Sequence, residues 1–399
     1  MNDYVVIREG KATLKVPNPM KYLRQDNVYE PAWAPVFYNP QQTLNRDLSV
    51  VVLATLTKTF TKRSEPLLVA DPFSGTGVRA IRYVLEVPSI DEAYANDLDL
   101  EAYNLIKENV KLNNLGEKIR VFRLDANAFL YLLKTLRKSF ILVDIDPYGT
   151  PAPYVDAGIW ALRRGGVLCV TATDTATLGG FKFEAGSKRY DVKLSRNDIP
   201  NDVGIRILLG FMARRAATRD RYLEPLLAYH EAHYYRVFVR VGKGADKALN
   251  MVETQLSYLE LCLTCGYRDY VQSLKKEDRC PVCGGKTAVI GPLWRGSLNN
   301  VEFLNEVKNT VGAEYQYLST YKRIVKLLDV ATSDLTHLKL YNVQTIARFL
   351  KVNIPQLSKI VECLTSKGFK ASKTSLCYTC IRTDADWSDL VDCVKGVET

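Results

Sequence analysis

Four aspartates of this sequence each follow an apolar run, and carboxylates at such places can bind a ligand or act as acids and bases. They lie at or just after the ends of predicted strands, and they are Asp71, Asp97, Asp125 and Asp146. Ligands of a parallel sheet bind at the carboxyl ends of its strands, so we expect the four carboxylates on one rim. A single strand-end aspartate is usually a helix cap. Four of them are poorly explained by capping and indicate a binding site.

The last of these aspartates begins the motif Asp146-Pro147-Tyr148-Gly149, which suits methyl transfer to an exocyclic amine of a base. Such a nitrogen is a poor nucleophile because its lone pair is delocalised into the ring. A carboxylate and a backbone carbonyl can accept its two N–H bonds, and the carboxylate can then take the proton. Proline fixes the turn, and the Tyr148 ring offers a stacking face. We therefore predict Asp146, Pro147 and Tyr148 as the catalytic residues.

A glycine-rich turn, Asp71 to Arg79, follows the first apolar strand and leads into a helical pattern. Gly75 and Gly77 allow a sharp bend and a close approach of the backbone to a ligand. The pattern Gly75-x-Gly77-x-x-Ala80, with Asp97 about twenty residues on, fits the dinucleotide fingerprint. It therefore permits NAD, and it equally permits S-adenosylmethionine, whose enzymes also use an acid after the second strand. The motif at Asp146 favours S-adenosylmethionine, because a dehydrogenase has no use for it.

Each predicted cofactor residue has a task. Asp97 would accept hydrogen bonds from the ribose hydroxyls, and Asp125 with Ala126 would meet the adenine amino group. Asp71 would lie near the methionine ammonium. Either Arg46 or Arg79 could pair with the methionine carboxylate, although Arg79 could equally be solvated. The predicted cofactor-binding set is Arg46, Asp71, Gly75, Gly77, Arg79, Asp97, Asp125 and Ala126.

The elements that must position these residues alternate between strand and helix over residues 66–175, which predicts a parallel sheet covered on both faces. The predicted strands are Leu67–Ala70, Glu92–Asn96, Ile119–Leu124, Ile141–Asp144 and Val167–Thr171. The predicted helices include Leu100–Leu112, Ala126–Leu136 and Pro153–Leu162. The fold class is therefore α/β, a Rossmann-like class I methyltransferase sheet with an N-terminal arm and a C-terminal α+β domain.

The 399 residues suffice for two or three domains, and no window resembles a membrane span or a signal peptide. We therefore expect a cytoplasmic protein without membrane association. The formal net charge of +10 favours a polyanionic partner such as nucleic acid, although a basic surface also aids solubility. No obligate protein partner is indicated.

The nine cysteines are more typical of thiols or metal ligands than of a disulfide framework. Two C-x-x-C pairs, separated by fourteen residues and each followed by glycine, resemble a zinc ribbon with slightly short spacing. They predict a structural zinc held by Cys262, Cys265, Cys280 and Cys283. The lone pair Cys377 and Cys380 is interpreted as ordinary thiols. Core positions are predicted for the other three, Cys169, Cys363 and Cys393.

The regions around the sheet are assigned as three domains. Residues 1–50 form an arm with a hairpin over Val5–Val16, followed by a helix from Leu48 to Phe60. Residues 51–242 form the methyltransferase domain, which ends with a helix over Val203–Ala217 and strands over Tyr229–Val241, and the boundary falls at Gly242–Gly244. Its basic stretch Phe181–Asn201 is either a solvated loop or a phosphate contact.

The third domain is the C-terminal domain, residues 243–399. It would hold a zinc-ribbon-like element at 258–292 and a winged-helix-like unit at 320–399. Within the latter, Tyr321–Leu328, Val343–Leu350 and Ile354–Lys367 are amphipathic helical patterns. They could contact nucleic acid or simply pack.

Taken together, the motifs resemble the tRNA (guanine-26-N2)-dimethyltransferase family from about residue 4 past residue 300. The matching segments are Phe37–Pro40, Asn45–Asp47, Asp71–Arg79, Ala95–Asp97, Asp125–Asn127, Asp146–Gly149, Val203–Leu208, His233–Phe238 and Gly291–Trp294. The resemblance implies two successive methylations of a guanine N2 in the tRNA core, with S-adenosylmethionine as donor. It also implies that the C-terminal domain, residues 243–399, binds the tRNA. It assigns Arg46, Arg79, Asp97, Asp125 and Ala126 to the cofactor.

The resemblance also assigns Asp146 to catalysis, and the family usually has phenylalanine where this chain has Tyr148. Some members lack the four cysteines, which implies that the metal is not needed for the chemistry. A guanine hidden in the tRNA core would have to be flipped out of its stack. Three alternatives stay open: a methyltransferase for another exocyclic base amine of RNA or DNA, a non-catalytic tRNA-binding protein, and an NAD enzyme.

Overall fold

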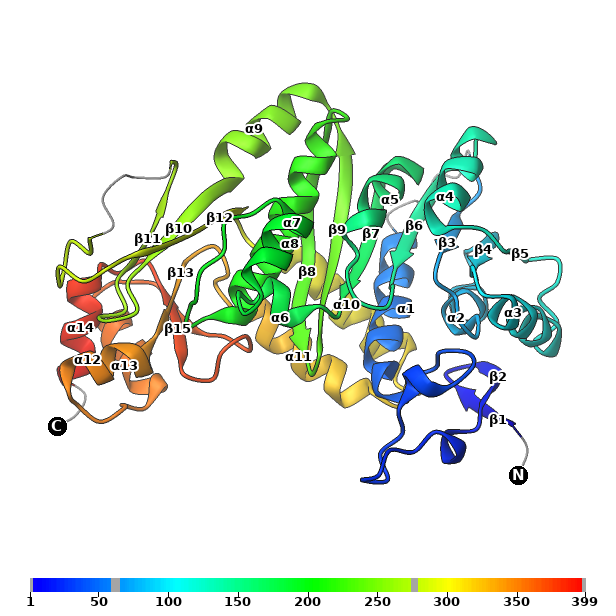
Figure 1. Cartoon of the computed structure of the whole chain (residues 1–399), viewed down its shortest axis with the longest axis horizontal. Helices are drawn as coiled ribbons and strands as arrows, with labels where there is room; N and C mark the ends of the chain where they lie inside the picture. The colour runs from blue at the N-terminus through cyan, green and yellow to red at the C-terminus, as the bar shows by residue number, and fades with distance from the viewer. Residues whose placement is uncertain (1–2, 59–64, 274–278, 397–399) are drawn as a thin grey trace. The chain divides into compact units, whose positions relative to one another are not determined.

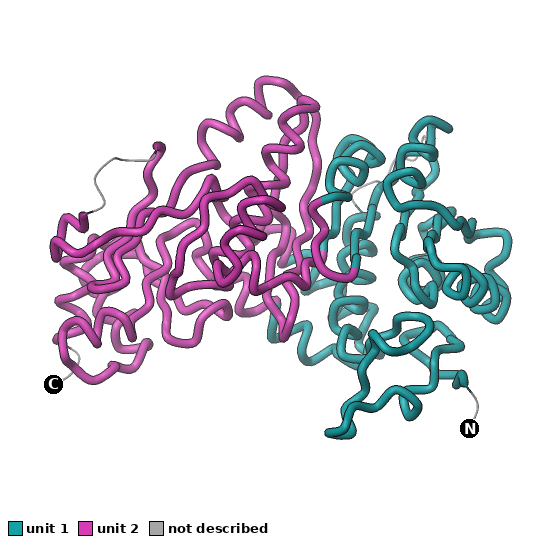
Figure 2. Tube along the Cα trace, viewed as in Figure 1, with its two compact units in different colours: residues 1–147, 153–170, 305–327 teal, residues 148–152, 171–304, 328–399 magenta. Residues whose placement is uncertain are grey.

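The computed structural model describes residues 3–58, 65–273 and 279–396, which divide into two compact units (Figure 2). Unit 1 comprises residues 1–147, 153–170 and 305–327, and unit 2 comprises residues 148–152, 171–304 and 328–399. The predicted boundary at Gly242–Gly244 lies inside unit 2, and residues 305–327 belong to unit 1 although they follow that boundary. The assignment of three functional domains stays a prediction.

Unit 1 is built on five parallel strands in the order β5-β4-β3-β6-β7 (Figure 1). Their bounds are β3 Leu68–Asp71, β4 Glu92–Asn96, β5 Ile119–Phe122, β6 Phe140–Ile145 and β7 Leu162–Ala172, of which the last two residues belong to unit 2. The five predicted strands are confirmed, because strands buried on both faces appear in a sequence as short apolar runs. The central strands β3 and β6 are buried at every residue.

Helices connect these strands, as expected for parallel neighbours. They are α2 Val78–Glu86, α3 Leu100–Leu112, α4 Ala126–Thr135 and α5 Val155–Ala161. Helix α2 packs against α1 Thr43–Lys58, and α4 packs against α5. Helix α1 begins five residues before the predicted start at Leu48, and the predicted end at Phe60 lies outside the described residues.

The N-terminal arm opens with the predicted hairpin, β1 Tyr4–Glu9 and β2 Ala12–Pro17, which turns at Gly10. Short 3-10 helices follow at Pro19–Lys21, Pro31–Trp33 and Pro40–Gln42. Asparagine or glutamate side chains cap all three, and proline occupies their first turn. The arm contacts α2 and α3 through β2.

Unit 2 contains an antiparallel hairpin and two small three-stranded sheets. The hairpin is β8 Arg221–Glu231 and β9 Tyr234–Lys243. One sheet is β11 Arg268–Val271, β10 Leu256–Leu261 and β12 Ala288–Trp294, in that order, and the other is β13 Lys339–Asn342, β15 Cys380–Thr383 and β14 Ala371–Lys373. The helices are α6 Thr175–Leu178, α7 Phe183–Tyr190, α8 Pro200–Ala217, α9 Ala245–Gln255, α12 Val343–Leu350, α13 Leu357–Ser366 and α14 Trp387–Gly396.

Two further helices, α10 Val301–Glu314 and α11 Tyr321–Ser333, begin in one unit and end in the other. The predicted helices of the C-terminal region are present, and α12 has the predicted bounds. The stretch 181–201 is not a loop throughout, because α7 occupies its first half. Among the described residues, no helix is long and apolar enough to cross a membrane.

Four cysteines form disulfides that the sequence did not predict. The structure joins Cys363 of α13 to Cys393 of α14 in a disulfide, and it joins Cys377 to Cys380 in a second one. The prediction of ordinary thiols is therefore wrong for Cys377 and Cys380. Cys393 is buried in the core as predicted, and Cys363 is half-buried against that core, but the disulfide that joins them was not expected. The first pair is 30 residues apart in sequence, and only the packing of α13 on α14 brings the two Cα atoms to 5.8 Å. Cys169 of β7 is fully buried, which confirms its predicted core position.

Candidate active site

The structure places the four aspartates at the carboxyl ends of parallel strands in unit 1. Asp71 is the last residue of β3, and Asp97 follows β4 directly. Asp125 precedes α4, and its Oδ1 accepts hydrogen bonds from the amides of Asn127 (2.9 Å) and Ala128 (3.1 Å). Asp125 is thus also a helix cap. Asp146 follows β6, whereas Tyr148 belongs to unit 2 and its side chain is 83 % exposed.

The glycine turn is hydrogen-bonded to Asp97. The Gly75 amide donates to Asp97 Oδ2 at 2.8 Å, and the Asp99 amide donates to Oδ1 at 3.1 Å. Gly75 and Gly77 both have positive φ, of 52° and 80°. A Cβ on Gly75 would lie 2.9 Å from the Phe37 carbonyl oxygen, so the turn approaches the arm too closely for a side chain. Burial raises the pKa of Asp97.

Arg79 joins the glycine turn to the motif at Asp146. Its buried guanidinium pairs with Asp146 through Nη2, and the same nitrogen donates to Asn45 Oδ1 at 3.0 Å. Its Nη1 lies 3.5 Å from Asp144 Oδ2. The alternative that Arg79 is solvated is therefore wrong. The contact with Asp146 was not visible in the sequence, because β6 begins more than sixty residues after the turn.

Asp71 is the most unusual acid of the rim. Its side chain is 1 % exposed, and neither carboxyl oxygen has a hydrogen-bond partner among the described residues. Burial, together with the charge of Asp144, raises its pKa to about 7. A buried carboxyl without a partner is costly. A cationic ligand group beside Asp71 would remove that cost.

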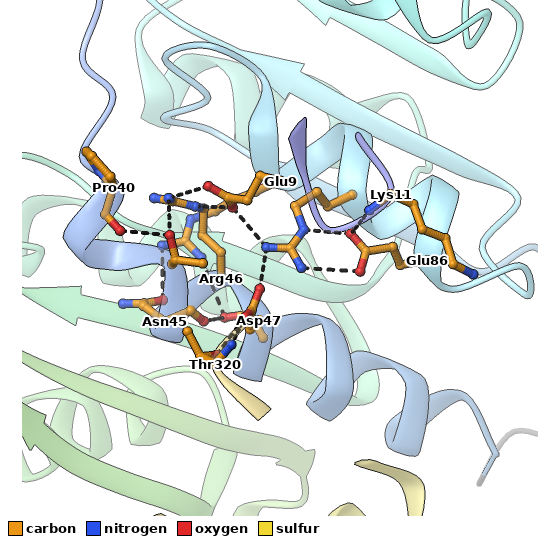
Figure 3. A network of polar contacts seen from close by, with 12 residues as sticks. Glu9, Lys11, Pro40, Asn45, Arg46, Asp47, Glu86 and Thr320 are labelled. Carbon is orange, nitrogen blue, oxygen red and sulfur yellow. Dashed lines mark hydrogen bonds and ion pairs between the residues drawn. The ribbon is translucent and has the colours of Figure 1, made fainter. Parts of the chain in front are cut away.

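Arg46, the other predicted cofactor arginine, lies in a buried ionic network (Figure 3). Its Nε and Nη2 donate to the two carboxylate oxygens of Glu9 at 2.7 and 2.6 Å, and its Nη1 donates to the Asn39 carbonyl at 3.1 Å. The Tyr38 hydroxyl donates to Glu9 Oε2 at 2.8 Å. Burial alone would raise the pKa of Glu9, but Arg46 and Arg82 outweigh it and lower that pKa to about 2.

Arg82 of α2 is the centre of this network and is fully buried. Its Nη1 lies 2.9 Å from Glu9 Oε1 and 2.7 Å from Asp47 Oδ1, and its Nε donates to Glu86 Oε1 at 2.6 Å. One guanidinium therefore joins the arm, α1 and α2. Without Arg82, three buried carboxylates would have only Arg46 as a buried cation in this network.

Residues 305–327 complete the network from the far end of the chain. Thr320 Oγ1 donates to Asp47 Oδ2 at 2.6 Å, and the Tyr317 hydroxyl donates to Glu86 Oε2 at 2.7 Å. The Tyr315 hydroxyl donates to the Glu86 carbonyl at 2.8 Å. Sequence reasoning missed Glu9, Arg82 and Glu86. The motifs Phe37–Pro40 and Asn45–Asp47 were the signals that pointed to this region.

In unit 2, the four predicted metal ligands lie together. The Sγ atoms of Cys262, Cys265, Cys280 and Cys283 all lie within 4.8 Å of one another. The Sγ atoms of Cys262 and Cys283 are 3.6 Å apart, and those of Cys265 and Cys280 are 3.5 Å apart. A tetrahedral zinc with Zn–S bonds of about 2.3 Å separates its sulfurs by about 3.8 Å. The donor set therefore fits zinc.

Unit 1 also has an open cleft of about 1050 Å³, lined by α2, α3 and β5. Lys107, Lys111 and Lys118 line it together with apolar side chains. None of the predicted site residues does so. This cleft is therefore distinct from the aspartate rim.

Comparison with known proteins decides the family. The model of the family described as "N2,N2-dimethylguanosine tRNA methyltransferase" matches residues 10–395. The chain belongs to this family. A tRNA (guanine(26)-N(2))-dimethyltransferase of Saccharolobus islandicus is 38% identical over 393 residues, which are 98% of both chains. Its counterpart in Saccharolobus solfataricus is 36% identical over 393 residues, again 98% of both chains.

A solved structure of Trm1 from Pyrococcus horikoshii with S-adenosyl-L-methionine has a TM-score of 0.83 to this family member at 30% identity. The match covers 98% of this chain and 99% of that one. The family predicted from the motifs and the Rossmann-like α/β fold class are both confirmed. The chain is a methyltransferase, and the dehydrogenase alternative is wrong.

Proposed function

We propose that this chain transfers methyl groups from S-adenosylmethionine to the exocyclic N2 of guanine 26 in tRNA, twice, to give N2,N2-dimethylguanosine. The family and the relatives matched over nearly their whole length support this substrate. The observation that supports the chemistry is the position of the Asp146 carboxylate. It lies directly after β6 and pairs with the buried Arg79.

Asp146 acts on the guanine amine in this proposal. Its carboxylate accepts one N–H bond of N2, raises the electron density on that nitrogen and takes the proton as the methyl group transfers. Arg79 fixes the orientation of the carboxylate through their ion pair. Pro147 sets the turn, and the exposed Tyr148 ring stacks on the base. The sulfonium donor supplies an already activated methyl group, so positioning accounts for most of the catalysis.

The cofactor lies along the aspartate rim. Asp97 binds the ribose hydroxyls, and Asp125 with Ala126 binds the adenine amino group. Asp71, buried and without a hydrogen-bond partner among the described residues, receives the methionine ammonium. Gly75 and Gly77 let the backbone approach the ligand. Arg46 and Arg79 are the two candidates for the methionine carboxylate.

Binding of S-adenosylmethionine should release about one proton at pH 6 and almost none at pH 8.5. The pKa of Asp71 is about 7 in the protein alone, and it falls when a cation lies beside the carboxyl group. A proton therefore leaves at any pH at which Asp71 is protonated before the cofactor binds. Affinity for the cofactor should accordingly increase as the pH rises toward 7 and level off above it. Calorimetry in two buffers of different ionisation enthalpy measures the release. Asp71→Asn should abolish it, whereas no release from the wild type at pH 6 would contradict the assignment.

The four clustered cysteines hold a structural zinc in this proposal, because all four coordination positions are filled by thiolates. The protein purified without chelator should carry one zinc per chain. Cys265→Ser should lose at least nine-tenths of it and melt at a lower temperature, because metal binding is coupled to folding. Cys169→Ser, at a buried thiol outside the cluster, is the control and should keep its zinc. Equal zinc in both variants would rule out the site.

The substrate is tested with two tRNA transcripts that differ only at position 26. The transcript with guanine should accept methyl groups and the one with adenine should not. Binding of both should weaken steeply with salt, because phosphate contacts dominate affinity. Equal methyl incorporation into both transcripts would refute the position. Action without an obligate protein partner and the cytoplasmic location stay predictions from the sequence.

A further inference from the structure

We propose that Phe181 enters the tRNA base stack where the target guanine has left it. This inference rests on the proposed function. Phe181 follows α6 in unit 2, and its side chain is 67 % exposed. Most of the ring is therefore open to solvent, where it can stack on a base of the RNA.

The backbone that carries Phe181 is fixed. Its amide donates to the Ala176 carbonyl at 2.9 Å, and Asn197 Nδ2 donates to the Gly179 carbonyl at 3.0 Å. Gly180 has a φ of 83°, and a Cβ there would lie 2.8 Å from the Ser195 carbonyl oxygen. Only glycine fits this turn. The exposed ring thus projects from a rigid support, which lowers the entropic cost of inserting it into another molecule.

The same support holds the segment that carries Tyr148. Within unit 2, the Gly149 amide donates to Thr173 Oγ1 at 2.8 Å, and the Thr173 amide donates to the Gly149 carbonyl at 3.0 Å. The hydroxyls of Thr150 and Tyr190 are 2.8 Å apart, and that of Tyr190 donates to Asp174 at 2.9 Å. Thr173 and Asp174 immediately precede α6, and Tyr190 ends α7. The segment with Tyr148 is therefore tied to both ends of the stretch with Phe181.

The excess of positive charge in the stretch that contains Phe181 favours a nucleic acid over an apolar partner. Five exposed cations lie within residues 181–196, namely Lys182, Lys188, Arg189, Lys193 and Arg196. The exposed acids of the same stretch are Glu184 and Asp191, which leaves a net charge of +3 (five minus two). Cations flanking an exposed ring match a strand of nucleic acid, which offers phosphates beside stacked bases.

The proposed reaction explains why an aromatic ring besides Tyr148 would be needed. A base that is flipped into a pocket leaves a gap in its stack, and closing that gap competes with the flipped state. Apolar side chains inserted between base steps hold such gaps open. Tyr148 follows the catalytic carboxylate by two residues and stacks on the flipped guanine. Phe181, on a separate turn of the same support, takes the vacated position.

The test uses the full-length enzyme with a tRNA that carries 2-aminopurine at position 26, whose fluorescence rises when the base is unstacked. Wild type should give a large rise. Phe181→Ala should lose most of it and should lower kcat/KM for unlabelled tRNA by about 10- to 100-fold, the value of one aromatic–base stack. Affinity for S-adenosylmethionine and the melting temperature should stay unchanged. Phe181→Trp should restore both readouts, and Leu249→Ala, at an exposed apolar residue of α9, should change neither.

Two results would overturn the inference. One is a Phe181→Ala variant that unstacks and methylates like the wild type. The other is a slower variant with the full fluorescence rise, which would place the ring elsewhere on the RNA. Wild type is assayed on the same unlabelled tRNA as the variants. If wild type fails to methylate it, both the proposed function and this inference are overturned. If wild type methylates the tRNA and Phe181→Ala behaves like wild type, only the role of Phe181 is overturned.

Discussion

Asp146→Asn should lower kcat for methyl transfer by about 10²- to 10⁴-fold, the usual contribution of a general base. The amide has nearly the shape of the carboxylate, but it cannot take the proton that leaves N2 as the methyl group arrives. Arg79 still has Asp144 and Asn45 as partners, so the fold around it should persist. Single-turnover transfer from labelled S-adenosylmethionine measures the rate.

Two controls separate this chemical role from a structural one. The affinity of Asp146→Asn for S-adenosylmethionine and for tRNA should stay within about threefold of wild type, because the base acts in the chemical step. Asp392→Asn, at an exposed carboxylate of α14, should leave the rate unchanged. An Asp146→Asn enzyme with more than a tenth of the wild-type rate would exclude Asp146 as the base.

Arg82→Met should destabilise the protein by about 3–5 kcal/mol, the typical cost of breaking a buried ion pair by removing one partner. The substitution leaves Glu9, Asp47 and Glu86 buried, with Arg46 as the one remaining cation of the network. Urea denaturation followed by circular dichroism measures the loss.

A matched control is Arg120→Met, which removes a pair with Glu92 at 3.6 Å whose arginine is 52% exposed. Exposed pairs contribute about 0–1 kcal/mol, so this variant should be nearly as stable as wild type. Similar losses in the two variants would show that the buried network adds no more than an ordinary surface pair.

The sequence predicted the parts of the site that depend on local pattern. Short apolar runs followed by aspartate predicted the strands and placed the four aspartates at strand ends, because strand ends and turns are set by neighbouring residues. The glycine turn was equally readable, since Gly75 and Gly77 adopt positive φ. The family followed from the motifs taken as a set, and the family model matched the same chain from residue 10 to residue 395.

The buried network could not be predicted in this way. Its members come from the arm, α1, α2 and residues 305–327, and charged residues in a sequence normally indicate surface. Arg82 sits in a helix whose pattern gives no sign that its charge is buried. The disulfide between Cys363 and Cys393 was missed for the same reason, since it depends on how α13 packs on α14.

The most direct test of the proposed function is the identity of the methylated nucleoside. The purified enzyme is incubated with unmodified tRNA and labelled S-adenosylmethionine, the tRNA is digested to nucleosides, and the labelled products are identified by mass. We predict N2-methylguanosine at early times and N2,N2-dimethylguanosine at completion. Labelled methyladenosine or methylcytidine without any N2-methylated guanosine would contradict the proposal.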